Sequence, residues 1–163
     1  MVISAVTYQN WNRDVQSAFY NIIRDNIDSE EVKYITDRIP VELEKGLKNV
    51  PFIIINEAIR RETRPRGDNA VKIVDFEIHV DVVTDNATRD KYNNQRGATE
   101  LRKLLDLVAY VIDQNLASFE TYNLSNIKIT DEIHLTPVKN EHGVRKYESQ
   151  LRFIGRWIGS WLK

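Results

Sequence analysis

The segment 71–84, VKIVDFEIHVDVVT, constrains the fold more than any other part of the chain, because its apolar and polar residues alternate with a period of two. The apolar set is Phe76, Ile78, Val80 and Val82, and the polar set is Asp75, Glu77, His79 and Asp81. Successive side chains of a strand point to opposite faces of a sheet. The pattern therefore predicts a long strand in a sheet with one face on a core and one face in water.

The preceding residues predict the antiparallel partner of this strand. Residues 51–62, PFIIINEAIRRE, begin with an apolar run and continue with mixed residues, as in a strand whose far end projects into solvent. The connecting residues RPRGDN contain Pro65 and Gly67, which favour a turn. We therefore expect a long hairpin whose tip is rich in arginine.

Two further segments have the spacing of amphipathic helices, with apolar residues three and four positions apart. They cover residues 10–27, which Asn10 or Asn12 would cap, and residues 98–116. The two apolar stripes are Trp11, Val15, Ala18, Phe19, Ile22 and Ile23, and Leu101, Leu104, Leu105, Val108, Val111 and Ile112.

The C-terminal part of the chain predicts a second long hairpin. In residues 125–138 the expected inward set is Ile127, Ile129, Ile133 and Leu135, and in the last strand it is Tyr147, Leu151, Phe153 and Trp157. Gly155 and Gly159 indicate a bulge or a close backbone approach. A short strand at 32–36 and an irregular segment at 37–51 complete the order.

This order predicts a single α+β domain over residues 1–163. Two long hairpins form a mainly antiparallel sheet, and the two amphipathic helices pack on one of its faces.

Composition limits the classes of function. Lys and Arg total 23 against 24 for Asp and Glu, so a formal net charge of -1 gives no general attraction to nucleic acid or an anionic membrane. The absence of cysteine excludes a disulfide framework, a thiol nucleophile and Cys-ligated zinc. We see no secretion signal and no apolar segment near the ~20 residues of a membrane span, and we expect no membrane partner.

The polar row on the alternating strand has two interpretations. Asp75, Glu77 and His79 have residue types that metal or acid-base sites use, but an alternating sheet must also place polar residues on its wet face. The histidines at 79, 134 and 142 lack the paired spacing of zinc ligands, although His79 and His134 are candidates for cross-strand neighbours. We favour the solvated face, and we predict no catalytic residue, no metal and no cofactor.

The stretch 60–69, RRETRPRGDN, also has competing interpretations. Its RGD triplet signals adhesion only in a secreted protein, and two acids reduce its four arginines to a net +2, without an aromatic residue for base stacking. We therefore expect no sequence-specific binding of nucleic acid. A hairpin that contacts another protein fits better, and a solvated loop remains the alternative. The predicted partner-binding residues are Arg60, Arg61, Arg64, Arg66 and Asp68.

Two tryptophans near the C-terminus, Trp157 and Trp161, lie within a strongly apolar segment. Such residues either complete the core or form a contact surface. Both residues are therefore possible interface residues.

The layout resembles the tail terminator, or tail completion, proteins of long-tailed bacteriophages and related viruses. The segments that carry the resemblance are WNRDVQSAFYNII, PFIIINEAIRRETRPRGDN, FEIHVDVVTDN, ATELRKLLDLVAYVIDQNL, IKITDEIHLTPV and YESQLRFIGRWI. The resemblance implies a non-enzymatic ring, commonly hexameric, that caps the tail tube, ends its polymerisation and joins it to the head. It also implies contacts with the tube protein and a neck or head-completion protein, and a place in the virion after assembly in the host cytoplasm.

Three alternatives stay open. The chain also suits another neck or head-tail connector protein. A small ligand- or metal-binding enzyme domain would build its site from Asp75, Glu77 and His79. A nucleic-acid-binding module would show steep salt dependence.

Overall fold

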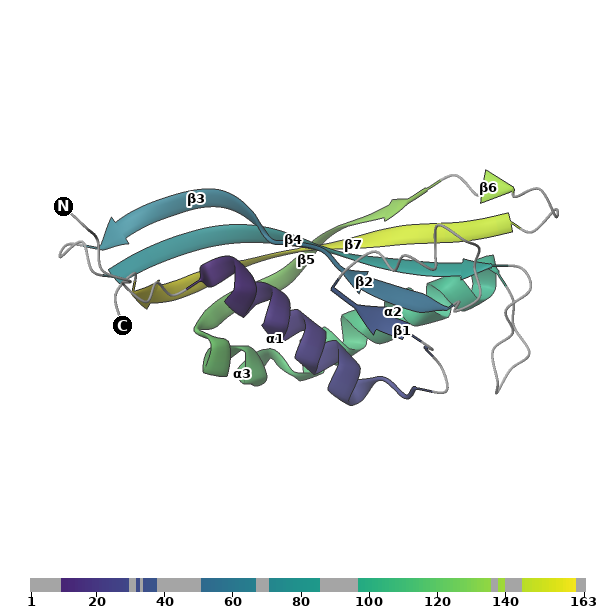
Figure 1. The fold of residues 1–163 in the computed structure, drawn as a ribbon, viewed down its shortest axis with the longest axis horizontal. Helices are drawn as coiled ribbons and strands as arrows, with labels where there is room; N and C mark the ends of the chain where they lie inside the picture. The colour runs from purple at the N-terminus through teal and green to yellow at the C-terminus, as the bar shows by residue number, and fades with distance from the viewer. Residues whose placement is uncertain are drawn as a thin grey trace, which may run out of the picture.

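The computed structural model describes residues 10–29, 32, 34–37, 51–66, 71–85, 97–135, 138–139 and 145–160. These residues form two layers, a long twisted sheet and a set of helices that cover one of its faces (Figure 1). Because the sheet is mainly antiparallel and the helices lie on one side, the predicted α+β class is confirmed.

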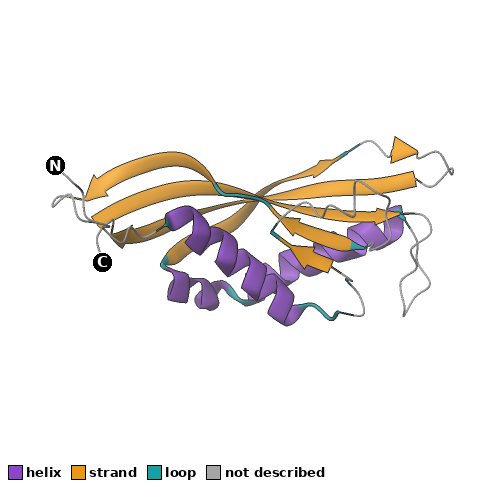
Figure 2. Ribbon diagram, viewed as in Figure 1, coloured by secondary structure: helices purple, strands orange, loops and turns teal. Residues whose placement is uncertain are grey.

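Seven strands form the sheet. Figure 2 colours the strands orange and the helices purple. They are β1 (Tyr34–Thr36), β2 (Phe52–Ile55), β3 (Ile59–Arg66), β4 (Val71–Asp85), β5 (Leu124–His134), β6 (Val138–Lys139) and β7 (Arg145–Ser160). The main path runs β1-β2-β4-β7-β5, while β3 pairs with β4 beyond the end of β2, and β6 pairs with β7. Among the described strands, only β1 and β2 run parallel to each other.

The pairing of β4 with β7 forms the centre of the sheet. All 15 residues of β4 pair with β7, from Val71 opposite Ser160 to Asp85 opposite Lys146, in one continuous register. Alternate side chains of β4 are buried from Val74 to Val82, which confirms the predicted period of two. The buried side of the ladder faces the helices, and its polar side forms the open face of the sheet.

The helices are α1 (Trp11–Asn26), α2 (Ala98–Gln114), the short α3 (Leu116–Phe119) and a 3-10 turn, η2 (Glu120–Tyr122). Both predicted apolar stripes are buried. Asn10 is the N-cap of α1, where its side chain accepts a hydrogen bond from the Arg13 amide at 3.2 Å. Within the described part of the chain, no helix is long and apolar enough to cross a membrane.

The segment expected to be one strand at 51–62 is two strands, β2 and β3, which pair in turn with the same edge of β4. At the break between β2 and β3, side chains form hydrogen bonds with backbone groups. Asn56 Nδ2 donates to the His79 carbonyl at 3.1 Å, and the Ala58 amide donates to Asn12 Oδ1 on α1 at 3.1 Å. Since buried backbone groups need partners, these bonds allow the ladder to stop and restart.

The alternation expected along β5 is wrong beyond Ile127, because two register shifts interrupt its pairing with β7. The first shift lies between Ser125 and Lys128 and the second between Ile129 and Asp131. Each bulge moves the following side chains to the other face. Of the four residues expected to point inward, Ile127 is buried at 8% exposure, Ile129 and Leu135 are 44% and 45% exposed, and Ile133 is partly exposed.

Gly155 marks a close approach between β7 and its neighbours. It lies opposite Phe76 in an uninterrupted ladder with β4, and the first register shift of β5 lies opposite it, between the partners of Arg156 and Ile154. The predicted bulge is therefore found on β5, and side chains, not backbone, fill the space beside Gly155. A Cβ atom at this position would lie 2.5 Å from Ile127 Cδ1 and 2.6 Å from Phe76 Cζ. The missing side chain lets these two core residues meet across the strand.

We expect Gly155→Ala to lower the free energy of unfolding by about 1–3 kcal/mol, because the added methyl group forces two well-packed side chains apart. Urea denaturation followed by circular dichroism measures this loss. Gly159→Ala, at the half-buried end of the same strand, is the matched control and should change the free energy by less than ~1 kcal/mol. An equal loss in both variants would show that the contact with Phe76 and Ile127 is not the cause.

Candidate assembly surface on the open face of the sheet

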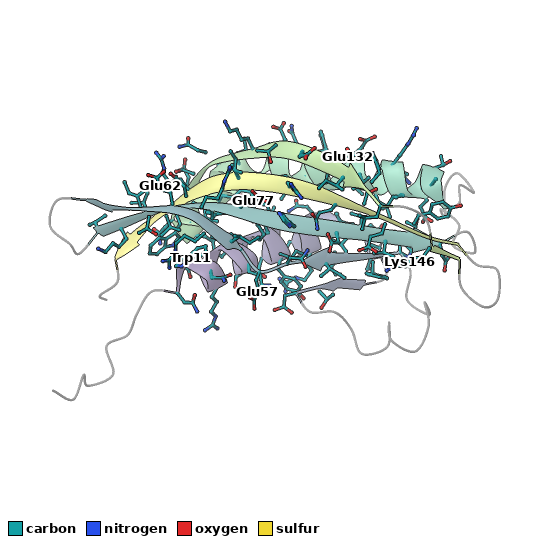
Figure 3. All side chains as sticks on the ribbon, turned by 90° about the horizontal axis from the view of Figure 1, so that it is seen from above. Trp11, Glu57, Glu62, Glu77, Glu132 and Lys146 are labelled. Atoms are coloured by element: carbon teal, nitrogen blue, oxygen red, sulfur yellow. The ribbon has the colours of Figure 1, made fainter. Side chains whose placement is uncertain are left out.

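The open face of the sheet carries the polar residues of the central ladder. Figure 3 looks down on this face and labels Glu62 on β3 and Glu77 on β4. The facing pairs are Asp75 with Arg156, Glu77 with Ile154, His79 with Arg152, and Asp81 with Gln150. Near β2 the same side of the sheet becomes apolar, where Phe52, Ile54 and Val83 form a small buried cluster.

The two aspartates of the row are held by cross-strand hydrogen bonds. Asp75 accepts from Arg156 Nε at 2.8 Å and from its Nη2 at 3.5 Å. Asp81 accepts from Gln150 Nε2 at 2.7 Å and from Asn56 Nδ2 at 3.0 Å. Among the described residues, no group of three or more His, Asp or Glu side chains is arranged to hold a metal ion. The two aspartates therefore link neighbouring strands through hydrogen bonds.

Glu77 and His79 form the tightest polar contact of the face, with His79 Nε2 and Glu77 Oε1 2.5 Å apart. This hydrogen bond lowers the pKa of Glu77, whereas burial of the carboxyl acts in the opposite direction, and the charges of Arg152 and Arg61 lower it further. The proposed neighbour relation between His79 and His134 is wrong. His79 faces Arg152 on the open face, while His134 pairs with Ser149 on the helix side.

A second polar cluster, which no local pattern predicts, lies on the helix side of β5 and β7. His134 Nδ1 lies 2.8 Å from Ser149 Oγ, and His134 Nε2 lies 2.9 Å from Glu132 Oε1. A hydroxyl, an imidazole and a carboxylate in this order are the groups of a serine hydrolase triad. Ser149 is 0% exposed, so a substrate carbonyl has no path to its hydroxyl in this conformation. The contact between His134 and Ser149 links β5 to β7. It could have been predicted only with the register of these two strands in hand.

A groove runs along the open face between the two edge strands β3 and β5. Its volume is about 680 Å³, and the side chains that matter for its chemistry are Arg61, Asp75, Asn126, Lys128, Ile154 and Arg156. Register shifts flank it on both sides, at residue 61 of β3 and at residues 126–127 of β5. Bulges bend a strand and increase its twist. The edge strands β3 and β5 therefore bend on either side of the groove. Ile154 and the Asp75–Arg156 pair form its floor.

The predicted arginine-rich tip is corrected by the structure, because residues 60–66 belong to strand β3. Arg60 pairs opposite Phe76, and its guanidinium lies 5.5 Å from the centre of the Trp11 ring on the helix side. Arg61, at the bulge, lies on the open face with its Nε 3.9 Å from Glu77 Oε2. The side chains of Arg64 and Arg66 and the whole of Asp68 lie outside the described residues.

The interface prediction for Trp157 is wrong, and its alternative, completion of the core, is right. Trp157 is 0% exposed, and its indole Nε1 donates to Asp14 Oδ2 on α1 at 3.1 Å. It lies on the buried side of β7 opposite Leu124. Trp161 lies outside the described residues.

No protein-family model matches this chain, and no curated protein matches it. Its function has to be argued from the fold and from the open face.

We expect Glu77→Gln to lower the free energy of unfolding by about 1 kcal/mol near neutral pH, because the amide replaces a charged hydrogen-bond acceptor. Since the folded-state pKa of Glu77 is lowered, its contribution is present above the unfolded value of 4.5 and is lost as the pH falls through the folded value. The difference between wild type and variant should therefore shrink at acid pH in urea titrations.

Glu132→Gln is a matched control, because Glu132 and His134 form the same spacing of residues on a more exposed strand. Exposed ion pairs contribute little to stability, so this variant should differ from wild type by less than ~0.5 kcal/mol. A pH-independent loss in Glu77→Gln would contradict the role given to its charge.

Proposed function

We propose that the protein is a non-enzymatic virion structural protein that resembles a phage tail terminator. In this role it forms a ring, commonly of six copies, that caps the tail tube, ends its polymerisation and joins it to the neck. Its partners are further copies of itself, the tube protein and a neck or head-completion protein. Its place is the tail or neck of the virion, after assembly in the host cytoplasm.

The observation that carries this proposal is the long sheet face that the helices leave open. The polar row runs along β4 from Asp75 to Asp81, and the four strands β3, β4, β7 and β5 span about 14 Å across. The groove lies across these strands and is lined by residues of all four. Such a face suits a protein partner better than a small substrate.

The order of elements also supports the proposal. A helix, a short strand, a long hairpin, a second helix and a second long hairpin follow one another, as the resemblance implies. The groups that an enzyme would need on the open face are engaged with one another. Asp75 is bound to Arg156, Glu77 to His79, and Asp81 to Gln150. These contacts favour a structural role over acid-base chemistry.

Native mass spectrometry over a concentration series, with negative-stain images of the same samples, tests the proposal. We expect closed rings with a central hole, whose population rises with protein concentration. Purified tails that lack the protein should acquire one ring at the end of the tube when it is added. A protein that stays monomeric at the highest concentration, and also fails to bind such tails, would contradict the proposal.

Substitutions at two neighbouring arginines distinguish an effect on assembly from an effect on stability. Arg61→Ser should reduce ring formation at least tenfold with little change in stability, because Arg61 lies on the open face. Arg60→Ser should leave ring formation unchanged and lower the free energy of unfolding by about 0.5–1 kcal/mol, because it loses the contact with the Trp11 ring. Analytical ultracentrifugation and urea denaturation measure the two effects. The reverse pattern would place the contact surface on the helix side of β3.

A further inference from the structure

The groove on the open face and the outward side of helix α2 are complementary in charge and shape. We propose that the groove of one copy binds α2 of the next copy, front to back. This inference rests on the proposed ring and names the joint between its subunits.

Cationic side chains lie at the two edges of the groove, around an apolar centre. Arg61 lies on the β3 side, with its Nε 3.9 Å from Glu77 Oε2, and Lys128 lies on the β5 side. Half-buried Ile154 lies between them on β7. The carboxylate of Asp75 on the floor is bound by Arg156, and Glu62 also lines the groove. An acidic segment with one apolar or aromatic side chain at its centre fits this arrangement.

The C-terminal half of α2 has these properties. Asp106, Tyr110 and Asp113 are four and three positions apart, so they share one face of the helix, and all three are exposed. Tyr110 is 62% exposed, the largest value among the described large hydrophobic residues. Aromatic side chains at the centre of a contact commonly anchor protein interfaces. Tyr110 would lie on Ile154, and the two aspartates would face Arg61 and Lys128.

The dimensions agree with a helix as occupant. The outer strands β3 and β5 are about 14 Å apart across two intervening strands, and Asp106 and Asp113 are about 10 Å apart along the axis of α2. A helix whose axis crosses the strands would therefore place one aspartate near each edge of the groove.

The edges of the sheet are poorly suited to the alternative joint, in which a strand of one copy extends the sheet of another. Among the described strands, β1 has three residues, β3 carries a bulge and Pro65, and β5 carries two bulges. Short, bulged and proline-containing edges discourage strand addition. Among the described residues, the open face and the helix layer are the other large surfaces.

The two surfaces lie on opposite faces of one sheet, which determines the symmetry of the joint. When the groove of one copy holds α2 of a second, the first copy keeps a free α2 and the second a free groove. Repetition of such a heterologous contact gives a ring if the rotation closes. A two-fold dimer cannot satisfy it, because the two patches lie on opposite faces of the sheet and cannot both meet the same partner.

Charge reversal on each side of the joint tests the proposal. The groove variant carries Arg61→Glu and Lys128→Glu, and the helix variant carries Asp106→Lys and Asp113→Lys. The matched control, Arg13→Glu with Arg24→Glu, makes the same change of charge as the groove variant on exposed positions of α1. Circular dichroism and thermal unfolding establish that each variant is folded, and native mass spectrometry with negative-stain images gives the assembly state.

We expect the control to form rings like wild type and each joint variant to lose them. A mixture of the groove and helix variants should form rings of alternating copies at least partly, because one joint of each pair is wild type and the other joins two surfaces of reversed charge. The chain with all four reversals should regain rings to a similar extent. Rings in either joint variant alone, or no association in the mixture, would overturn the inference and leave the proposed ring intact. A wild-type protein that forms no ring would overturn both.

Discussion

The register between β4 and β7 is the constraint on which the rest of the structure depends. Because side chains alternate along a strand, a shift by one residue would place Asp75, Glu77 and His79 against the helices and the apolar residues in water. The ladder thus separates a dry side, where Trp157 and Phe76 pack, from a polar side that holds the groove. On the dry side, Gly155 leaves the space in which the side chains of Phe76 and Ile127 meet.

Local sequence patterns were sufficient to predict the helices and the strand whose apolar side chains form the core. The alternation of β4, the stripes of α1 and α2 and the cap at Asn10 all depend on residues within a few positions of one another. The break at Asn56 and the bulges of β5 were missed, because they depend on partners far away in the chain, such as the bond between Asn12 and Ala58. The same reason explains the site. The polar row could be predicted, whereas its pairing, the separation of Arg60 from Arg61 and the His134–Ser149 contact required the register.

In the proposed assembly, the charges of the open face would contribute to specificity more than to affinity. The Asp75–Arg156 pair already has its hydrogen bonds inside one subunit, so a covering partner removes water from it without adding a bond. Arg61 and Lys128 lie at the rim, where charges direct the approach and orientation of a partner. Affinity then has to come from apolar contact at the centre of the face, around Ile154.

The hydrogen bond between Trp157 and Asp14 joins residues 143 positions apart, and the central ladder joins strands that are also distant in the chain. A ribosome makes the N-terminal residues first, so α1 and β4 emerge before the strand that covers them. The groove needs β3, β4, β5 and β7 together, and it therefore comes into existence only when β7 has been made and paired. In the proposed assembly, nascent chains on one messenger would therefore have no groove with which to capture one another, and association would be delayed until each subunit has folded.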